Sequence, residues 1–171
     1  TQSPACTDTA GTTCLDDTVF VGNSADGGAP MYSMHCPLGK TWNGSTCDGS
    51  AATMCWNKCA TGTTTGYTSD ITGEYNTAGL VASAATDKPF TAAKACGDST
   101  AYGYDDWYLP ANTEIRSLSG TAATAMGVSS SNIWTSTETG SNDARYTSYV
   151  SGWNLAYGAK SNTYRVHCVR K

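Results

Sequence analysis

Residues 106–115 read Asp-Trp-Tyr-Leu-Pro-Ala-Asn-Thr-Glu-Ile, a run that passes from apolar residues through a proline into a helical pattern. Trp107, Leu109 and Pro110 invite a functional label, but buried packing and turn chemistry explain such residues more often. We therefore predict that these residues are structural: they pack in the core and lead the chain into the helix. Glu114 lies near the predicted helix start, where a carboxylate complements the helix dipole or caps backbone N–H groups.

The helix that follows is predicted over residues 112–119. Asn112 is its expected cap, Ile115 and Leu118 its inward-facing residues and Gly120 its end. One further turn is expected over residues 121–126.

A second helix is predicted upstream, over residues 87–97. Asp87 can cap it, Pro89 suits its first turn and Gly97 ends it. Phe90, Ala93 and Cys96 then share one face. The polar stretch 62–81 has little apolar content and is expected to be a long ordered loop.

Strands are predicted on both sides of these helices. Residues 18–21 and 31–34 flank a turn-rich segment and form a first hairpin. Asn43-Gly44 predicts the turn of a second hairpin, which brings Cys47 toward Cys36. Four short strands, forming a terminal antiparallel sheet, are expected at residues 133–136, 145–150, 153–157 and 164–169.

Composition limits the possible functions. The 171 residues suit one domain, 14% are charged and the formal net charge is −4. Helix formers are scarce while Thr, Tyr, Trp, Gly and Ser are abundant, which favours sheet and loop in an α+β fold. A pI near 4.9 without a long basic run argues against nucleic acid as a partner. No apolar run is long enough to insert this segment into a membrane.

The eight cysteines indicate a disulfide framework made in an oxidising compartment, hence an extracellular or cell-surface protein. Their spacing lacks the paired knuckles of a structural zinc site. Eight cysteines allow 105 pairings, so the residues alone leave most of the connectivity open.

Three ordered motifs point to a family. Residues 106–115, Asn132-Ile-Trp-Thr-Ser-Thr-Glu138 and Tyr164-Arg-Val-His-Cys-Val-Arg170 resemble the signature of the bacterial DUF1566 family, typified by the C-terminal domain of a Legionella collagen-like adhesin. Residues 36–47 also resemble a segment frequent in that family. Tyr108 and His167 stand where the family more often has Arg. The resemblance covers about residues 31–171, leaving 1–30 as a disulfide-pinned arm and hairpin.

The resemblance implies a C-type-lectin-like module with two short helices, a terminal sheet, long ordered loops and four disulfides. In such folds the first helix is often tied to the last strand, which corresponds here to Cys96 with Cys168. With Cys36–Cys47 taken from the hairpin, Cys6 is left to pair with Cys14 and Cys55 with Cys59.

A ligand-binding surface is predicted in the terminal sheet, where aromatic and amide residues alternate with small ones. Aromatic rings give contact area at low entropic cost, and amides give adaptable hydrogen bonds. Strand alternation nevertheless implies that about half of the aromatics are core. The candidates are Arg145, Tyr146, Tyr149, Trp153, Asn154, Tyr157, Lys160, Asn162 and Tyr164.

The basic C-terminal residues are expected to form a solvated edge strand, with an anion-binding patch as the alternative. They are Lys160, Arg165, His167, Arg170 and Lys171. No cofactor is expected, although Glu138, Asn142 and Asp143 offer closely spaced oxygens for a calcium ion.

These observations predict a non-catalytic adhesion or receptor-binding domain that recognises a glycan or a host-surface protein. A structural pilin-like or fibre subunit that assembles with copies of itself is the alternative. A third possibility is an oxidoreductase resembling formylglycine-generating enzymes, whose sequences share a stretch similar to residues 107–115. That possibility requires a free thiol, which the last 70 or so residues can supply only from Cys168.

Overall fold

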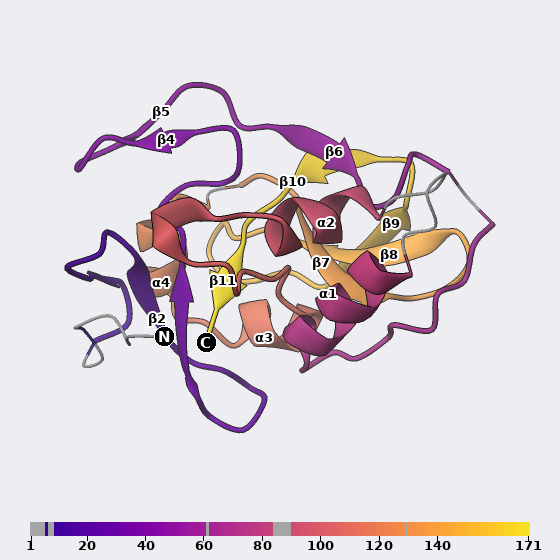
Figure 1. Cartoon of the computed structure of the whole chain (residues 1–171), viewed down its shortest axis with the longest axis horizontal. Coiled ribbons are helices and arrows are strands. Elements are labelled where there is room, and N and C mark those ends of the chain that lie inside the picture. The colour runs from indigo at the N-terminus through magenta and orange to yellow at the C-terminus, as the bar shows by residue number, and fades with distance from the viewer. Residues whose placement is uncertain (1–5, 7–8, 61, 84–89, 129) are drawn as a thin grey trace.

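The computed structural model describes residues 6, 9–60, 62–83, 90–128 and 130–171, and it has a mixed α+β architecture (Figure 1). One sheet has four strands in the order β1 (Thr12–Thr13), β2 (Val19–Asn23), β3 (Pro30–Ser33) and β11 (Val169–Arg170). A second has five in the order β6 (Thr53–Cys55), β10 (Thr163–Arg165), β7 (Ile133–Glu138), β8 (Asp143–Thr147) and β9 (Ala156–Ala159). The hairpin of β4 (Thr41–Trp42) and β5 (Cys47–Asp48) stands apart from both.

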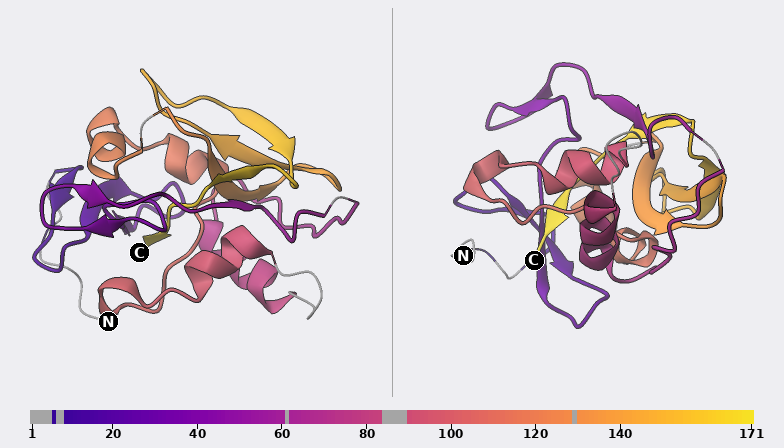
Figure 2. Two further views of the ribbon diagram at one scale, coloured as in Figure 1. Left: turned by 90° about the horizontal axis from the view of Figure 1, so that it is seen from above. Right: turned by 45° about the vertical axis from the view of Figure 1, so that its right-hand side comes forward.

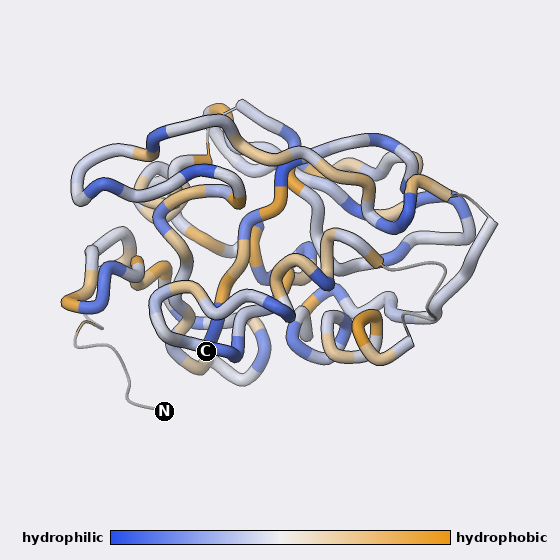
Figure 3. Tube along the Cα trace, turned by 45° about the horizontal axis from the view of Figure 1, so that its top comes forward, coloured by the Kyte–Doolittle hydropathy of each residue, from blue (hydrophilic) through white to orange (hydrophobic). Residues whose placement is uncertain are grey.

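The helices pack on two sides of these strands (Figure 2). Helices α1 (Gly73–Ala82) and α2 (Thr91–Gly97) contact each other and β7. Helix α3 (Asn112–Arg116) contacts β7 and β8, and α4 (Gly120–Ala125) contacts β2. A 3-10 turn, η1 (Ala101–Gly103), follows α2. The hydropathy of the chain agrees with this arrangement, because apolar segments run through the middle of the molecule (Figure 3).

All four predicted disulfides are present: Cys6–Cys14, Cys36–Cys47, Cys55–Cys59 and Cys96–Cys168. The last joins α2 to the residue before β11 across 72 positions of sequence. Every cysteine is therefore paired. Cys168, the only cysteine that could have supplied the thiol of a formylglycine-generating reaction, is in the disulfide with Cys96.

The prediction of a loop over residues 62–81 is wrong, because α1 occupies its second half. Its Gly, Thr and Asn residues are weak helix formers, so local propensity did not reveal it. Leu80 is fully buried against the core, and Asn76 Nδ2 donates to the Ser69 carbonyl at 2.7 Å and to Ser136 Oγ at 3.3 Å. Tertiary contacts thus stabilise this helix.

The other helices agree with the predictions except at their ends. Helix α2 ends at Gly97 and buries Ala93 and Cys96, whereas the proposed cap and first-turn residues, Asp87 and Pro89, lie outside the described residues. Ala111 occupies the cap position of α3, so Asn112 is its first residue. Gly120 begins α4, whose cap is Ser119 with Oγ 3.1 Å from the Ala122 nitrogen.

The terminal strands are not a purely antiparallel sheet. Strand β10 pairs parallel to β7, with Arg165 opposite Ile133. The predicted strand over residues 164–169 is interrupted, and its end becomes β11, which pairs with β3 in the other sheet.

The basic C-terminal residues do not form a solvated edge, because Lys160, His167 and Arg170 are buried. Arg170 Nε and Nη2 lie 2.6 and 2.9 Å from the two carboxylate oxygens of Asp106, and its guanidinium lies 3.7 Å from the ring centroid of Tyr104. The two buried cations are paired within the fold, Lys160 with Glu138 and Arg170 with Asp106, since an unpaired buried charge is costly.

His167 gives the protein a pH-dependent stability. Its Nε2 lies 2.8 Å from Ser33 Oγ and 2.9 Å from the Met34 carbonyl oxygen, and burial lowers its pKa to about 4. Because the unfolded chain binds the proton more readily, unfolding free energy is expected to fall as the pH drops from about 6.5 to about 4. Denaturant titrations across this range measure the slope. In His167→Gln, part of that slope should disappear, and an unchanged slope would contradict the assignment.

Candidate functional site

The three sequence motifs meet in the structure. The backbone N–H of Ser136 donates to the Pro110 carbonyl at 2.9 Å, and the N–H of Asn112 donates to Thr137 Oγ1 at 3.0 Å. Tyr108 and Val169 exchange two backbone hydrogen bonds of 2.8 and 3.0 Å. The motifs are thus one structural unit around α3.

Glu114 is the polar centre of that unit. Its buried carboxylate accepts hydrogen bonds from Ser24 Oγ at 2.8 Å, Tyr108 Oη at 2.9 Å, and the N–H groups of Ala111 at 3.0 Å and Gly73 at 3.1 Å. Burial, followed by the neighbouring Glu114 charge, raises the pKa of Tyr108 and keeps its hydroxyl a donor. The predicted capping role of Glu114 is confirmed, and Glu114 also holds the start of α1.

Trp107, Leu109 and Pro110 are buried, as the core interpretation requires. Trp107 Nε1 donates to the Ala101 carbonyl oxygen at 2.9 Å, and Leu109 N–H donates to Thr77 Oγ1 at 3.0 Å. The conspicuous motif therefore builds the scaffold, and a binding surface has to be sought elsewhere.

Two of the predicted ligand-binding tyrosines pack on the core. Tyr164 lies with its ring centroid 4.6 Å from those of both Trp134 and Tyr146. Asn162 Nδ2 donates to Tyr164 Oη at 3.0 Å. Gly158 lies directly against this cluster, since a Cβ there would be 3.1 Å from Tyr146 Cε1. Half-buried packing accounts for Tyr146 and Tyr164, whereas Asn162 is exposed.

Tyr149 and Trp153 form a second packed pair, with ring centroids 5.1 Å apart. Trp153 Nε1 donates to the Leu118 carbonyl oxygen at 2.8 Å. Asn154 Oδ1 accepts from the Ser148 N–H at 2.7 Å, which shapes the connection between β8 and β9. Trp153 is thus a structural anchor of this connection.

Lys160 is the candidate that the structure places farthest from solvent. Its side chain is 0% exposed and pairs with the equally buried Glu138. Lys160 Nζ also donates to the carbonyl oxygens of Thr63 at 2.7 Å and Ser141 at 3.2 Å, and it lies 5.0 Å from the ring centroid of Trp56. A ligand on the surface cannot reach this ammonium.

The same ion pair argues against the calcium site considered at Glu138, Asn142 and Asp143. Glu138 Oε2 accepts hydrogen bonds from the N–H groups of Thr65 and Gly66, and Oε1 pairs with Lys160. Asn142 Oδ1 accepts from the Gly62 N–H at 3.0 Å. A lysine ammonium already occupies the position in which a cation would sit. Within the described ranges, no three His, Cys, Asp or Glu side chains cluster as metal ligands do.

The β8–β9 hairpin, residues 143–159, exposes several large side chains at its tip and on its outer strand. Tyr157 on β9 is 65% exposed and pairs across the strands with Arg145. Val150 is 73% exposed and Leu155 is 53% exposed. Half of the exposed large apolar residues in the described chain lie in this hairpin. The sequence analysis did not identify Val150 and Leu155 as candidates. The signal was present, because both are aliphatic residues in a segment that contains Ser, Gly and Asn.

Comparisons with known proteins give one family. The family described as the Lcl C-terminal domain matches residues 45–170, which is most of the chain. No curated protein matches the sequence. In the described segments, no helix has the length and apolar character needed to cross a membrane. With three motifs joined around α3 and a match over residues 45–170, the chain belongs to the Lcl C-terminal domain family, a collagen-like adhesin family.

Proposed function

We propose that this chain is a non-catalytic adhesion or receptor-binding domain displayed outside the cell, and that the β8–β9 hairpin is its partner-binding surface. The observation that carries the proposal is the exposure of Val150, Leu155 and Tyr157 on one hairpin. Exposed apolar groups gathered in one place mark interaction surfaces more often than isolated ones do. Four disulfides fit a secreted or surface domain.

The hairpin offers both shape and hydrogen bonding. Strand β9 ends the five-stranded sheet, so one side of its backbone has no strand partner there. Arg145 and Asn154 lie beside the apolar residues and add a charge and an amide. Between a glycan and a host-surface protein, the aliphatic Val150 and Leu155 favour a protein, because branched apolar side chains match another protein's surface.

The test is a double variant, Leu155→Ala with Tyr157→Ala. Both side chains are more than half exposed, so the melting temperature is expected to stay close to that of the parent. Binding to intact target cells, measured by flow cytometry with labelled protein, is expected to fall at least about tenfold, as removal of central interface residues does. Undiminished binding would place the partner surface elsewhere.

Trp153→Ala is the matched contrast. Its indole bonds to Leu118, so this variant is expected to lose stability through the scaffold.

Self-assembly is the second candidate, and the unpartnered edge of β9 is the observation that favours it. Light scattering separates the two functions. A fibre subunit grows in mass with concentration, whereas an adhesion domain stays a monomer or a closed oligomer.

A further inference from the structure

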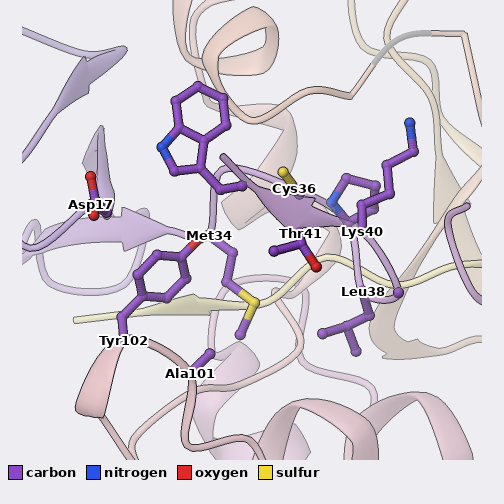
Figure 4. Close-up of a pocket in the computed structure, with 11 residues that line it drawn as sticks. Asp17, Met34, Cys36, Leu38, Lys40, Thr41, Ala101 and Tyr102 are labelled. Atoms are coloured by element: carbon purple, nitrogen blue, oxygen red, sulfur yellow. The ribbon is translucent and has the colours of Figure 1, made fainter. Parts of the chain in front are cut away.

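Hydrogen-bonding groups without a partner are of two kinds in the described chain. Some are buried side-chain atoms, such as Trp42 Nε1. An open hollow of about 300 Å³ lies beside Trp42, with Lys40 and Tyr102 in its lining (Figure 4). Because the indole N–H is closed to solvent, a molecule in the hollow cannot reach it. The others are backbone groups on the outer edge of β9, where a partner can reach them.

The register of the β8–β9 hairpin shows which backbone groups of β9 point outward. The Lys160 N–H donates to the Asn142 carbonyl oxygen at 2.8 Å, and the Asn154 N–H donates to the Ser148 carbonyl oxygen at 3.1 Å. The pairing of β8 with β9 between these two bonds keeps the same register. Residues that bond to the neighbouring strand alternate with residues that do not in an antiparallel pair. The even-numbered residues of 154–160 therefore bond to β8.

The intervening residues Leu155 and Tyr157 direct their N–H and C=O groups away from β8. No described strand lies on that side of β9, so these groups have no strand partner. Both residues are more than half exposed, which leaves the edge open to solvent. The result is a row of donors and acceptors at the spacing of an extended chain, and another extended backbone is what matches it.

This edge also lacks the features that keep edge strands from pairing. Natural edges are protected by lysines, prolines, bulges or very short strands. Strand β9 reads Ala-Tyr-Gly-Ala and pairs with β8 without a register shift. Lys160, which follows it, is buried against Glu138 and does not guard the edge. The other edge strands of the two larger sheets, β1, β6 and β11, have only two or three residues.

We propose that β9 binds an extended segment of its protein partner by adding that segment to the five-stranded sheet as a further strand. The inference rests on the proposed function of the β8–β9 hairpin and specifies how that surface recognises its partner. Main-chain hydrogen bonds to Leu155 and Tyr157 supply affinity, and the partner's side chains at alternate positions supply specificity.

The side chains of β9 indicate which partner segment fits. Leu155 and Tyr157 project from one face of the sheet, because residues two apart in a strand share a face. Apolar cross-strand pairs stabilise a sheet, so we expect apolar residues at alternate positions of the partner. A second folded copy of this chain fits less well, because its own four-residue β9 edge would bury far less area than a stable dimer needs.

The test starts from random linear peptides of about nine residues, long enough to form one strand, displayed on phage and selected on the full oxidised chain. We expect the enriched peptides to have apolar residues at alternate positions and no central proline. A synthetic peptide of enriched sequence should slow hydrogen exchange of the Leu155 and Tyr157 amides at least about tenfold, measured by NMR. The amides of Ala156 and Gly158, which already bond to β8, should change less.

Two substitutions at position 157 isolate the backbone contribution. Tyr157→Pro and Tyr157→Val both remove the aromatic ring, but only the proline deletes the outward N–H and blocks the incoming strand. Binding of the synthetic peptide is expected to be about tenfold weaker in Tyr157→Pro than in Tyr157→Val. The amide exchange of the parent decides the question even if Tyr157→Pro does not fold.

The proposal is overturned if selection yields no binder, if the peptide leaves the Leu155 and Tyr157 amides unprotected, or if Tyr157→Pro binds it as well as Tyr157→Val. Protection of these amides by rising protein concentration alone would also overturn it, because a second copy would then be the occupant. Cell binding of Leu155→Ala with Tyr157→Ala tests the proposed function separately. If that variant still binds cells while the peptide protects the parent's amides, strand addition stands and the proposed function falls.

Discussion

Replacing Lys160 with Met is expected to lower the free energy of unfolding by about 3–5 kcal/mol, the loss typical of breaking a buried ion pair. Glu138 would remain in a site where its side chain is 0% exposed, with its charge no longer neutralised. The carbonyl oxygens of Thr63 and Ser141 would lose their donor as well. Urea unfolding of the parent and the variant measures the difference.

Two comparisons isolate the cause. Lys94→Met breaks the half-exposed ion pair with Asp98 and is expected to cost no more than about 1 kcal/mol. Adding Glu138→Leu to Lys160→Met removes the stranded charge and should recover part of the loss. If Lys160→Met were as mild as Lys94→Met, the buried pair would not stabilise the protein in the way described.

Replacing Cys96 and Cys168 together with Ala is expected to cost about 4 kcal/mol, the loop-entropy contribution of a 72-residue closure. Both positions are fully buried, so the lost sulfur atoms add a packing penalty. Removing Cys55–Cys59, which closes only 4 residues, should cost about 2 kcal/mol in the same calculation. Thermal and urea unfolding of both variants give the ranking, and equal losses would contradict a loop-length effect.

The sequence predicted those parts of the fold whose cause is local. The Asn43-Gly44 turn, the end of α2 at Gly97 and the capping carboxylate of Glu114 each depend on neighbours in the chain. The disulfide from Cys96 to Cys168 came instead from the family resemblance, because nothing near either cysteine specifies its partner.

The errors share a different origin. Helix α1 has weak local propensity and forms because Leu80 and Asn76 meet the core and β7. Lys160 lies in a polar stretch of sequence that gives no sign of burial. It is buried because it pairs with Glu138, 22 residues away. The structure of α1 and the burial of Lys160 both depend on partners far away in the sequence, and such partners cannot be identified from a single sequence.

The candidate surface shows the same division. Alternation along the strands predicted that about half of the aromatic candidates would be core, but four of the five pack against the core: Tyr146, Tyr149, Trp153 and Tyr164. Tyr157 is exposed because it lies on the outer strand. Which strand is outermost depends on the sheet order, and that order follows from tertiary pairing.

The pairing of β11 with β3 has a consequence for biosynthesis. Val169 lies opposite Ser33 and Arg170 opposite Tyr32, so a sheet whose first strands are made early lacks its last strand until residue 170 has emerged. Cys96 likewise waits for Cys168. The β2–β3 hairpin cannot complete its packing during synthesis. The domain is therefore expected to fold cooperatively only after the whole segment has been synthesised.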